Sequence, residues 1–313
     1  MAAIEIIGLE KRYVTGFWRN REKLALRSLH LTVEGGEVLG FLGPNGAGKT
    51  TTLKLLMGLV FPTAGTARIL GMELDDPRMK AQIGFLPEQP YFYDYLTAKE
   101  LLRYYAHLSG VPAKECSARV AKTLAQVGLS ESADVQLRKL SKGMLQRVGL
   151  AQAILHDPKL VFLDEPMSGL DPMGRREVRD LIQGLQHEGK TVFFSTHILS
   201  DAEALCDRVA VIHQGELRGV GAVAALTSQV QGKVEIIFYG QAVPAGLANL
   251  GAEAHVSGEV IRAVLPEEKQ EAALEFLRRE NLRLVSLNPV RGSLEEYYIQ
   301  KLKPAADRVG AGA

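Results

Sequence analysis

Cysteine is nearly absent from this 313-residue sequence, which holds only Cys116 and Cys206. Two cysteines so far apart provide neither a disulfide framework nor the paired-thiol spacing of a metal site. The chain also lacks an apolar run of the roughly 18 residues that a membrane-spanning helix needs. Its start, Met-Ala-Ala-Ile-Glu-Ile, has no basic segment followed by an apolar core, so we expect no secretory signal. We therefore expect a cytoplasmic chain.

An excess of charge of one sign is lacking too. The 37 Lys and Arg residues nearly balance the 36 Asp and Glu residues. A protein that binds nucleic acid through a diffuse positive field needs more basic residues than this, so we expect no nucleic-acid partner. Hydrophobic residues make up 46% and charged residues 23%, which is typical of a globular protein.

The most informative feature is a glycine-rich segment at residues 43–50. It matches G-x-x-x-x-G-K-[ST], the pattern of the phosphate-binding P-loop. The apolar run 38–42 predicts a buried parallel strand before it, and the stretch 51–57 predicts a helix after it. This order turns backbone N–H groups and the positive end of a helix toward one point, where a polyphosphate binds. The expected nucleotide-binding residues are Gly43, Pro44, Asn45, Gly46, Ala47, Gly48, Lys49, Thr50 and Thr51.

The P-loop and a second strand predict the chemistry. We expect Lys49 to reach the β- and γ-phosphates and the Thr50 hydroxyl to hold Mg²⁺. The apolar run 160–163 ends in two adjacent carboxylates, Asp164 and Glu165. We expect Asp164 to face Mg²⁺, usually through water, and Glu165 to polarise an attacking water. Alone, the pair would fit a solvated acidic turn equally well, but the P-loop favours the catalytic interpretation.

A third segment predicts a helix that begins after Ser141, a good N-cap residue. Its apolar residues recur at helical spacing, at Met144, Val148, Ala151 and Leu155. A helix N-terminus with the Ser141 hydroxyl and Gly143 favours anion binding. By itself, however, the segment indicates only a capped amphipathic helix.

Together these segments resemble the ATP-binding subunit of an ABC transporter. The order is P-loop, Leu-Ser-x-Gly at 140–143, Asp-Glu at 164–165, Ser-Gly-Leu-Asp at 168–171 and Ser-Thr-His at 195–197. The resemblance covers about residues 4–221. It is closest to ATPases of exporters with separate membrane subunits, such as drug-efflux, sodium-extrusion and copper-maturation systems. It implies an α/β P-loop cassette with a mainly parallel sheet core, an antiparallel β part and a helical subdomain at about 88–153.

The resemblance also implies how the chain works. It implies a homodimer of head-to-tail cassettes with two MgATP at the interface, each held by one P-loop and by Ser141 and Gly143 of the other chain. It implies that His197 contacts the γ-phosphate, that Tyr13 stacks on adenine, and that the loop 168–171 links the two sites. Without the resemblance, Tyr13 would read as an ordinary half-buried aromatic. The expected function is ATP hydrolysis that drives an integral membrane subunit, in the direction of export, from the inner face of the cell membrane.

The chain departs from the family pattern in two places. Lys142 stands where the commonest signature has Gly, and Met144 replaces Gln, but the backbone donors of the helix start remain. The family's glutamine-bearing loop falls on Glu88 or Gln89. We favour Glu88, whose carboxylate can face Mg²⁺ but adds a negative charge beside the phosphates.

Outside these motifs the pattern indicates further elements. We expect strands at 191–195 and 208–213, and a first domain over 1–221. Within this domain we expect the alternation of strands and helices to be interrupted at 84–110. A small α+β domain over 222–303 follows, with a disordered tail at 304–313. The expected strands of this small domain are 234–239, 260–265 and 282–287. Its expected helices are 266–280 and 293–302.

Two features leave alternatives open. Tyr91, Phe92, Tyr93 and Tyr95 form either a surface for the membrane subunit or part of the core. The insertion 16–23, which holds Trp18, is either a solvated loop or an anchor at a membrane surface or partner. A soluble ABC-type ATPase acting on ribosomes or DNA is the alternative function, but the chain shows one cassette, no heptad run and no basic tail.

Overall fold

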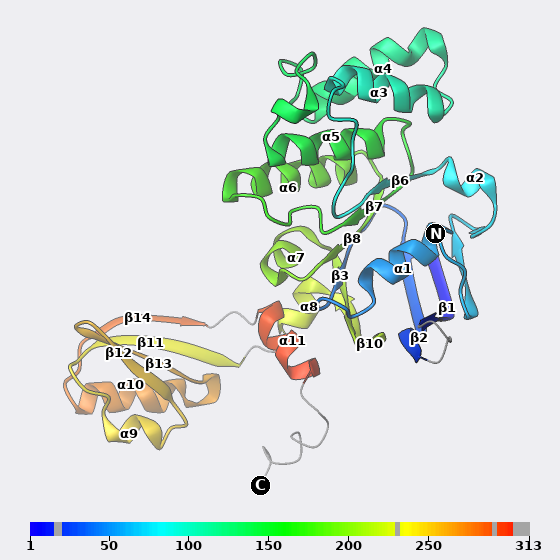
Figure 1. The fold of residues 1–313 in the computed structure, drawn as a ribbon. Helices are drawn as coiled ribbons and strands as arrows, with labels where there is room; N and C mark the ends of the chain where they lie inside the picture. Colours follow the sequence, from blue (N-terminus) through cyan, green and yellow to red (C-terminus); the bar gives the residue numbers. More distant parts are fainter. Residues whose placement is uncertain (16–20, 229–231, 290–292, 303–313) are drawn as a thin grey trace. The chain divides into compact units, whose positions relative to one another are not determined.

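The computed structural model describes residues 1–15, 21–228, 232–289 and 293–302. The chain separates into two compact units, Met1–Val223 and the unit that begins at Ala224 (Figure 1). The domain limits that we expect from the sequence, 1–221 and 222–303, stay predictions. Trp18 and the tail 304–313 lie outside the described residues.

A six-stranded sheet forms the centre of the first unit, in the order β10-β9-β3-β8-β7-β6. All neighbours are parallel except β9 and β10. Strands β3, β7 and β8 are buried along their whole length, as apolar runs in a parallel sheet should be. The bounds are β3 (Val38–Leu42), β6 (Ile83–Leu86), β7 (Leu160–Asp164), β8 (Thr191–Thr196), β9 (Arg208–His213) and β10 (Glu216–Ala222). The α/β fold with a mainly parallel sheet is confirmed.

Because parallel strands end at the same edge of a sheet, this order places three motifs side by side. The P-loop follows β3, Glu165 follows β7, and His197 follows β8, and these strands are neighbours. Ligands in open α/β sheets bind outside such carboxyl ends. The edge of the sheet is therefore where the site should lie.

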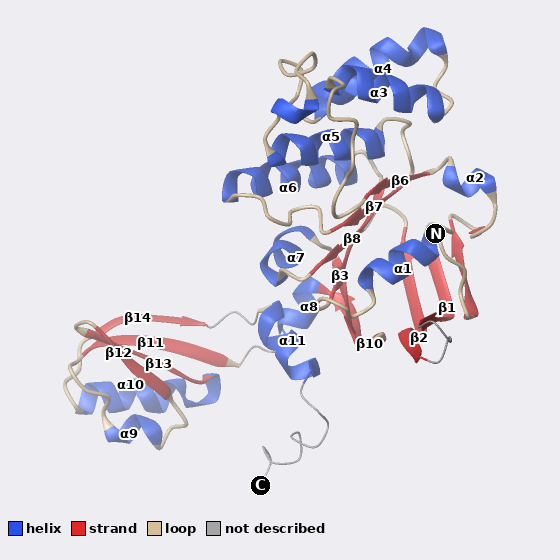
Figure 2. Cartoon of the chain, in the orientation of Figure 1, coloured by secondary structure: helices blue, strands red, loops and turns tan. Residues whose placement is uncertain are grey.

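An antiparallel sheet adds a second layer, in the order β2-β1-β4-β5. Its strands are β1 (Ala2–Thr15), β2 (Arg21–Glu34), β4 (Ala64–Ile69) and β5 (Met72–Glu73). Helix α1 (Lys49–Leu56) packs against both sheets, and its buried residues Leu53 and Leu56 belong to the core that the sheets share. Figure 2 shows α1 beside the strands of this sheet.

Helices make up the rest of the first unit. They are α2 (Pro77–Lys80), α3 (Ala98–Leu108), α4 (Ala113–Gln126), the 3-10 turn Leu137–Lys139, α5 (Lys142–Ile154), α6 (Pro172–His187) and α7 (Leu199–Leu205). The expected interruption at 84–110 is wrong at both ends, because β6 continues to Leu86 and α3 begins at Ala98. Position 84 lies within β6, and it must be glycine because a Cβ there would lie 2.1 Å from the Ala153 carbonyl oxygen. The expected interruption begins at this glycine, which instead marks a close approach of two backbones within the fold.

The second unit is a small α+β domain in the order β12-β13-β11-β14, with every pair antiparallel. Its elements are β11 (Lys233–Tyr239), α9 (Ala245–Ala248), β12 (Glu253–Ser257), β13 (Val260–Pro266), α10 (Gln270–Arg279), β14 (Leu284–Pro289) and α11 (Leu294–Leu302). The first six follow the β-α-β-β-α-β order of ferredoxin-like domains. Phe238, Ile261 and Leu277 belong to its core. Strand β12 was not expected, because it is short and mostly exposed.

Helix α8 (Val223–Ser228) begins at the last residue of the first unit. Among the described residues, no helix is both long and apolar enough to cross a membrane.

Candidate functional site

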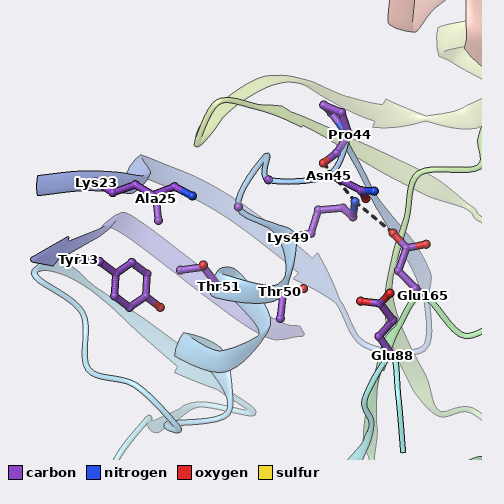
Figure 3. A pocket seen from close by; sticks show the side chains of 12 residues that line it. Tyr13, Lys23, Ala25, Pro44, Asn45, Lys49, Thr50, Thr51, Glu88 and Glu165 are labelled. Atoms are coloured by element: carbon purple, nitrogen blue, oxygen red, sulfur yellow. Dashed lines mark hydrogen bonds and ion pairs between the residues drawn. The ribbon is translucent and has the colours of Figure 1, made fainter. Parts of the chain in front are cut away.

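A pocket of about 360 Å³ opens over the P-loop (Figure 3). It brings together residues from three places: the P-loop, the antiparallel sheet and the carboxyl ends of β6 and β7. The lining residues are Tyr13, Lys23, Ala25, Pro44, Asn45, Gly46, Gly48, Lys49, Thr50, Thr51, Glu88 and Glu165. Of the predicted P-loop residues, all except Gly43 and Ala47 line the pocket.

Gly43 and Ala47 instead anchor the P-loop through backbone hydrogen bonds to other parts of the fold. Gly43 N–H donates to the Thr196 carbonyl at 3.3 Å, and the Ala47 carbonyl accepts from Gly215 N–H at 2.8 Å. Gly48 requires glycine for two reasons. Its φ is +113°, and a Cβ there would lie 2.7 Å from the Ala25 carbonyl oxygen. The loop backbone is therefore hydrogen-bonded to the six-stranded sheet and packs closely against β2 of the antiparallel sheet.

Lys49 is buried at the floor of the pocket, with its side chain 6% exposed. Its ammonium donates to the carbonyls of Gly43 at 2.7 Å and Pro44 at 3.3 Å. It also lies 3.1 Å from Glu165 Oε1. This last contact is an ion pair without hydrogen-bond alignment, because Oε1 is buried without a hydrogen-bond partner among the described residues.

Glu165 is the centre of the polar arrangement. Its second oxygen, Oε2, lies 2.8 Å from His197 Nδ1, while the His197 side chain is 43% exposed. Its φ is +49°, which is uncommon for a residue other than glycine. The Glu165 N–H donates to the carbonyl of Ser195 at 3.1 Å and to its hydroxyl at 3.2 Å. This turn holds the carboxylate between Lys49 and His197.

Asp164 takes a less exposed position than Glu165. It is 3% exposed and does not line the pocket, and its Oδ1 accepts from the Ser195 hydroxyl at 2.5 Å. Ser195 thus holds the Asp164 carboxylate and the Glu165 backbone at the end of β7. We assigned Ser195 no role from the sequence, although it stands in the Ser-Thr-His segment that we quoted.

One side of the pocket comes from the antiparallel sheet. Tyr13 in β1 pairs with Lys23 in β2, and Ala25 follows on the same strand. The Lys11 ammonium lies 5.1 Å from the centre of the Tyr13 ring. We did not predict Lys23 or Ala25 as site residues, since Lys23 reads as the end of an insertion unless the register of the two strands is known.

Glu88 lines the pocket and Gln89 does not, although both side chains are exposed. The structure therefore brings the residue that we favoured into the site. Figure 3 shows the Glu88 carboxylate on the same side as Glu165, opposite Tyr13.

Ser141 and Gly143 lie outside this pocket. Ser141 is exposed and caps α5, where its hydroxyl oxygen accepts from Met144 N–H at 3.2 Å, as the sequence predicts. The Lys142 ammonium lies so close to Gly169 that a Cβ on this glycine would be 2.1 Å from it. The helix start therefore contacts the loop 168–171 of its own chain.

Oxygen atoms are the donors that this site offers to a metal. Within the described residues, no cluster of three or more His, Cys, Asp or Glu side chains could hold an ion by itself. The Thr50 hydroxyl and the Glu88 carboxylate are at the pocket, and Asp164 lies at the adjacent strand end. Such a sparse oxygen set fits Mg²⁺, which keeps several waters and takes further ligands from substrate phosphates.

The fold, the P-loop and the paired carboxylates define a nucleotide-binding ATPase cassette. The ABC transporter family matches residues 26–168. An uncharacterized ABC transporter ATP-binding protein of Synechocystis is 43% identical over 309 residues, covering 96% of this chain and 84% of that protein. Nod factor export ATP-binding protein I of Paraburkholderia xenovorans is 35% identical over 292 residues, covering 89% and 93%.

Solved structures agree with this. A dimeric ATP-binding cassette in a post-hydrolysis state, bound to ADP and phosphate, has a TM-score of 0.63 and 26% identity, covering 70% of this chain and 98% of that one. The chain belongs to the family of ABC transporter ATP-binding proteins. It is the ATP-hydrolysing subunit of a transporter whose membrane-spanning part is a separate subunit.

Proposed function

We propose that two copies of this chain close head to tail around two MgATP, each bound between the P-loop pocket of one copy and the α5 start of the other. The observation that carries the proposal is that the two expected parts of the nucleotide site, the P-loop and the start of α5, are apart within one chain. Lys49 and Thr50 line the pocket, whereas Ser141 and Gly143 lie outside it. The dimeric cassette bound to ADP and phosphate among the solved structures supports a nucleotide-bound dimer.

Each pocket residue then has a role. Lys49 neutralises phosphate charge, and Tyr13 stacks on the base. Thr50, Asp164 and Glu88 would hold Mg²⁺, and this ion would neutralise negative charge on the phosphates. The positive charge of this ion would also offset the negative charges of Glu88 and Glu165, which line the pocket.

Glu165 is the proton acceptor for the attacking water. Its Oε1 is paired with Lys49 and its Oε2 with His197. When the Lys49 ammonium turns to the phosphates, Oε1 becomes free to accept a proton, while His197 keeps the carboxylate in place. His197 is itself exposed enough to reach the γ-phosphate from the same position.

The motor acts on a membrane-spanning partner, at the inner face of the cell membrane and in the direction of export. The name of the Nod factor export relative supports this direction. Tyr91, Tyr93 and Tyr95 form the surface for the partner. Their exposed fractions are 91%, 49% and 60%, and exposed aromatic clusters favour protein interfaces.

The test is purification of the tagged full-length chain from detergent-solubilised membranes of its source. We expect a polytopic membrane protein to co-purify and to stimulate MgATP hydrolysis. Recovery with ribosomes or DNA, and no membrane protein, would overturn the proposal and favour the soluble alternative.

A further inference from the structure

A buried carboxylate that plays no part in the pocket lies in α7. Asp201 is 2% exposed, and a buried carboxylate is costly unless charged partners hold it. Its partners are Arg175 and Arg179, which lie one turn apart on α6. Arg179 Nη2 donates to Asp201 Oδ1 at 3.3 Å, and Arg175 Nη1 lies 3.7 Å from Asp201 Oδ2.

The two arginines differ in one contact. Arg175 Nε also donates to the Leu170 carbonyl at 3.3 Å, and Leu170 belongs to the loop 168–171 just before α6. Arg179 Nε, by contrast, is buried without a hydrogen-bond partner among the described residues. Arg175 is therefore the arginine of this pair that joins Asp201 to the loop.

Asp201 is also connected, through the start of α7 and His197, to the carboxylate of Glu165. It lies in the first turn of α7, which begins two residues after His197. The turn between them is fixed by the Ile198 N–H, which donates to the Thr196 hydroxyl at 3.0 Å. His197 Nδ1 in turn lies 2.8 Å from Glu165 Oε2. The loop and Glu165 are thus joined by contacts at Arg175 and at His197, and by the short stretch of chain 197–201 between them.

One contact in this series is incomplete. Asp201 Oδ2 is buried without a hydrogen-bond partner among the described residues, and 3.7 Å from Arg175 is too long for a hydrogen bond. A small movement of Arg175 would close it into a charge-assisted hydrogen bond of about 2.7–2.9 Å. Buried polar atoms are normally hydrogen-bonded, so Asp201 Oδ2 should gain this bond when the loop moves Arg175 toward it.

We infer that Asp201 is a positioning residue. Through Arg175 it couples the loop 168–171 to the placement of His197 against Glu165. This rests on the proposed dimer, in which the loop 168–171 lies at the interface. Closure shifts the loop and Arg175, the Asp201 pair tightens, and α7 holds His197 where Glu165 needs it. The effect falls on turnover and not on nucleotide binding by the separate chains.

Two matched substitutions in the full-length chain test this: Arg175→Lys and Arg179→Lys. Both keep a positive charge near Asp201, but only Arg175→Lys removes the Nε bond to Leu170. Positioning contacts of this kind change coupling by about 0.5–2 kcal/mol, so Arg175→Lys should lower kcat about 2- to 30-fold. KM for MgATP and the melting temperature should match those of Arg179→Lys, whose kcat should stay near wild type. Asp201→Asn should lower kcat with KM unchanged.

Equal kcat for the two lysine variants would overturn the inference, and so would a loss that appears in KM. The proposed function is checked separately by MgATP-dependent dimer formation of the Glu165→Gln chain, in which bound ATP persists. If that dimer forms and Arg175→Lys turns over normally, only the role of Asp201 fails. If no dimer forms, the proposed function fails and this inference with it.

Discussion

Lys49 and Glu165 form a buried ion pair across the P-loop pocket, with Nζ 3.1 Å from Oε1 and side chains 6% and 7% exposed. The pair joins the start of α1 to the end of β7, so the residue expected to bind phosphate and the residue expected to activate water hold each other. Phosphate must compete with Glu165 for the same ammonium. The charge of Glu165 should therefore affect both binding and hydrolysis.

Glu165→Gln should slow hydrolysis by about 10²–10⁴, the usual contribution of a general base. MgATP affinity should rise or stay unchanged, because the variant removes a negative charge that competes for Lys49. It should accumulate as an ATP-bound dimer, visible by size-exclusion chromatography with light scattering. Near wild-type turnover would remove Glu165 from the mechanism.

Lys49→Ala should bind MgATP much more weakly, because the variant removes an ammonium that the P-loop carbonyls of Gly43 and Pro44 hold at the pocket, where it can neutralise phosphate charge. Thr50→Ala should instead weaken the dependence of binding on Mg²⁺ and leave metal-free ATP binding intact. Isothermal titration with ATP, with and without Mg²⁺, measures both. Unchanged affinity in Lys49→Ala would contradict the role assigned to this residue.

Glu88 and Gln89 make a matched pair, because they are adjacent and both exposed, yet only Glu88 lines the pocket. Glu88→Ala should raise the Mg²⁺ concentration needed for half-maximal hydrolysis, and Gln89→Ala should not. Titration of activity with Mg²⁺ distinguishes them. The opposite ranking would assign the family's glutamine-loop role to Gln89.

The aromatic segment after Glu88 divides into surface and core. Phe92 packs against the core of the first unit, while Tyr91, Tyr93 and Tyr95 are exposed. At least one of the three tyrosine-to-alanine variants should weaken binding to the membrane subunit by about 1 kcal/mol or more, the usual threshold for an important interface residue. Each should melt near the wild-type temperature.

Phe92→Ala is the control for that experiment, and it should lower the melting temperature. If the tyrosine variants melt early as well, and none selectively weakens partner binding, the segment serves the fold and not the partner.

Much of the fold and the centre of the site could be predicted from local sequence patterns. The P-loop and the strand before Asp164 are continuous stretches, so their apolar runs and glycines could be recognised without knowing the tertiary structure. What depends on pairing between distant segments could not be recognised. Lys23 joins the pocket only through the register that places it opposite Tyr13.

The same limit explains two other misses. Gly84 looks like a break in the sequence, because nothing local shows that the Ala153 carbonyl approaches it. Asp201 looks like an ordinary acidic residue in the first turn of a helix. Its burial between Arg175 and Arg179 follows from the packing of α6 and α7, which no local pattern encodes.

The central claim, a site shared between two chains, is tested most directly by mixing two defective chains. One carries Lys49→Ala and the other Ser141→Arg, both with Glu165→Gln so that bound ATP persists, and each has a different fluorophore. With shared sites, only the mixed dimer has one site with both halves intact. MgATP should therefore produce energy transfer between the two chains, while each chain alone stays monomeric. No energy transfer in the mixture, with a clear signal for Glu165→Gln alone, would contradict the shared site.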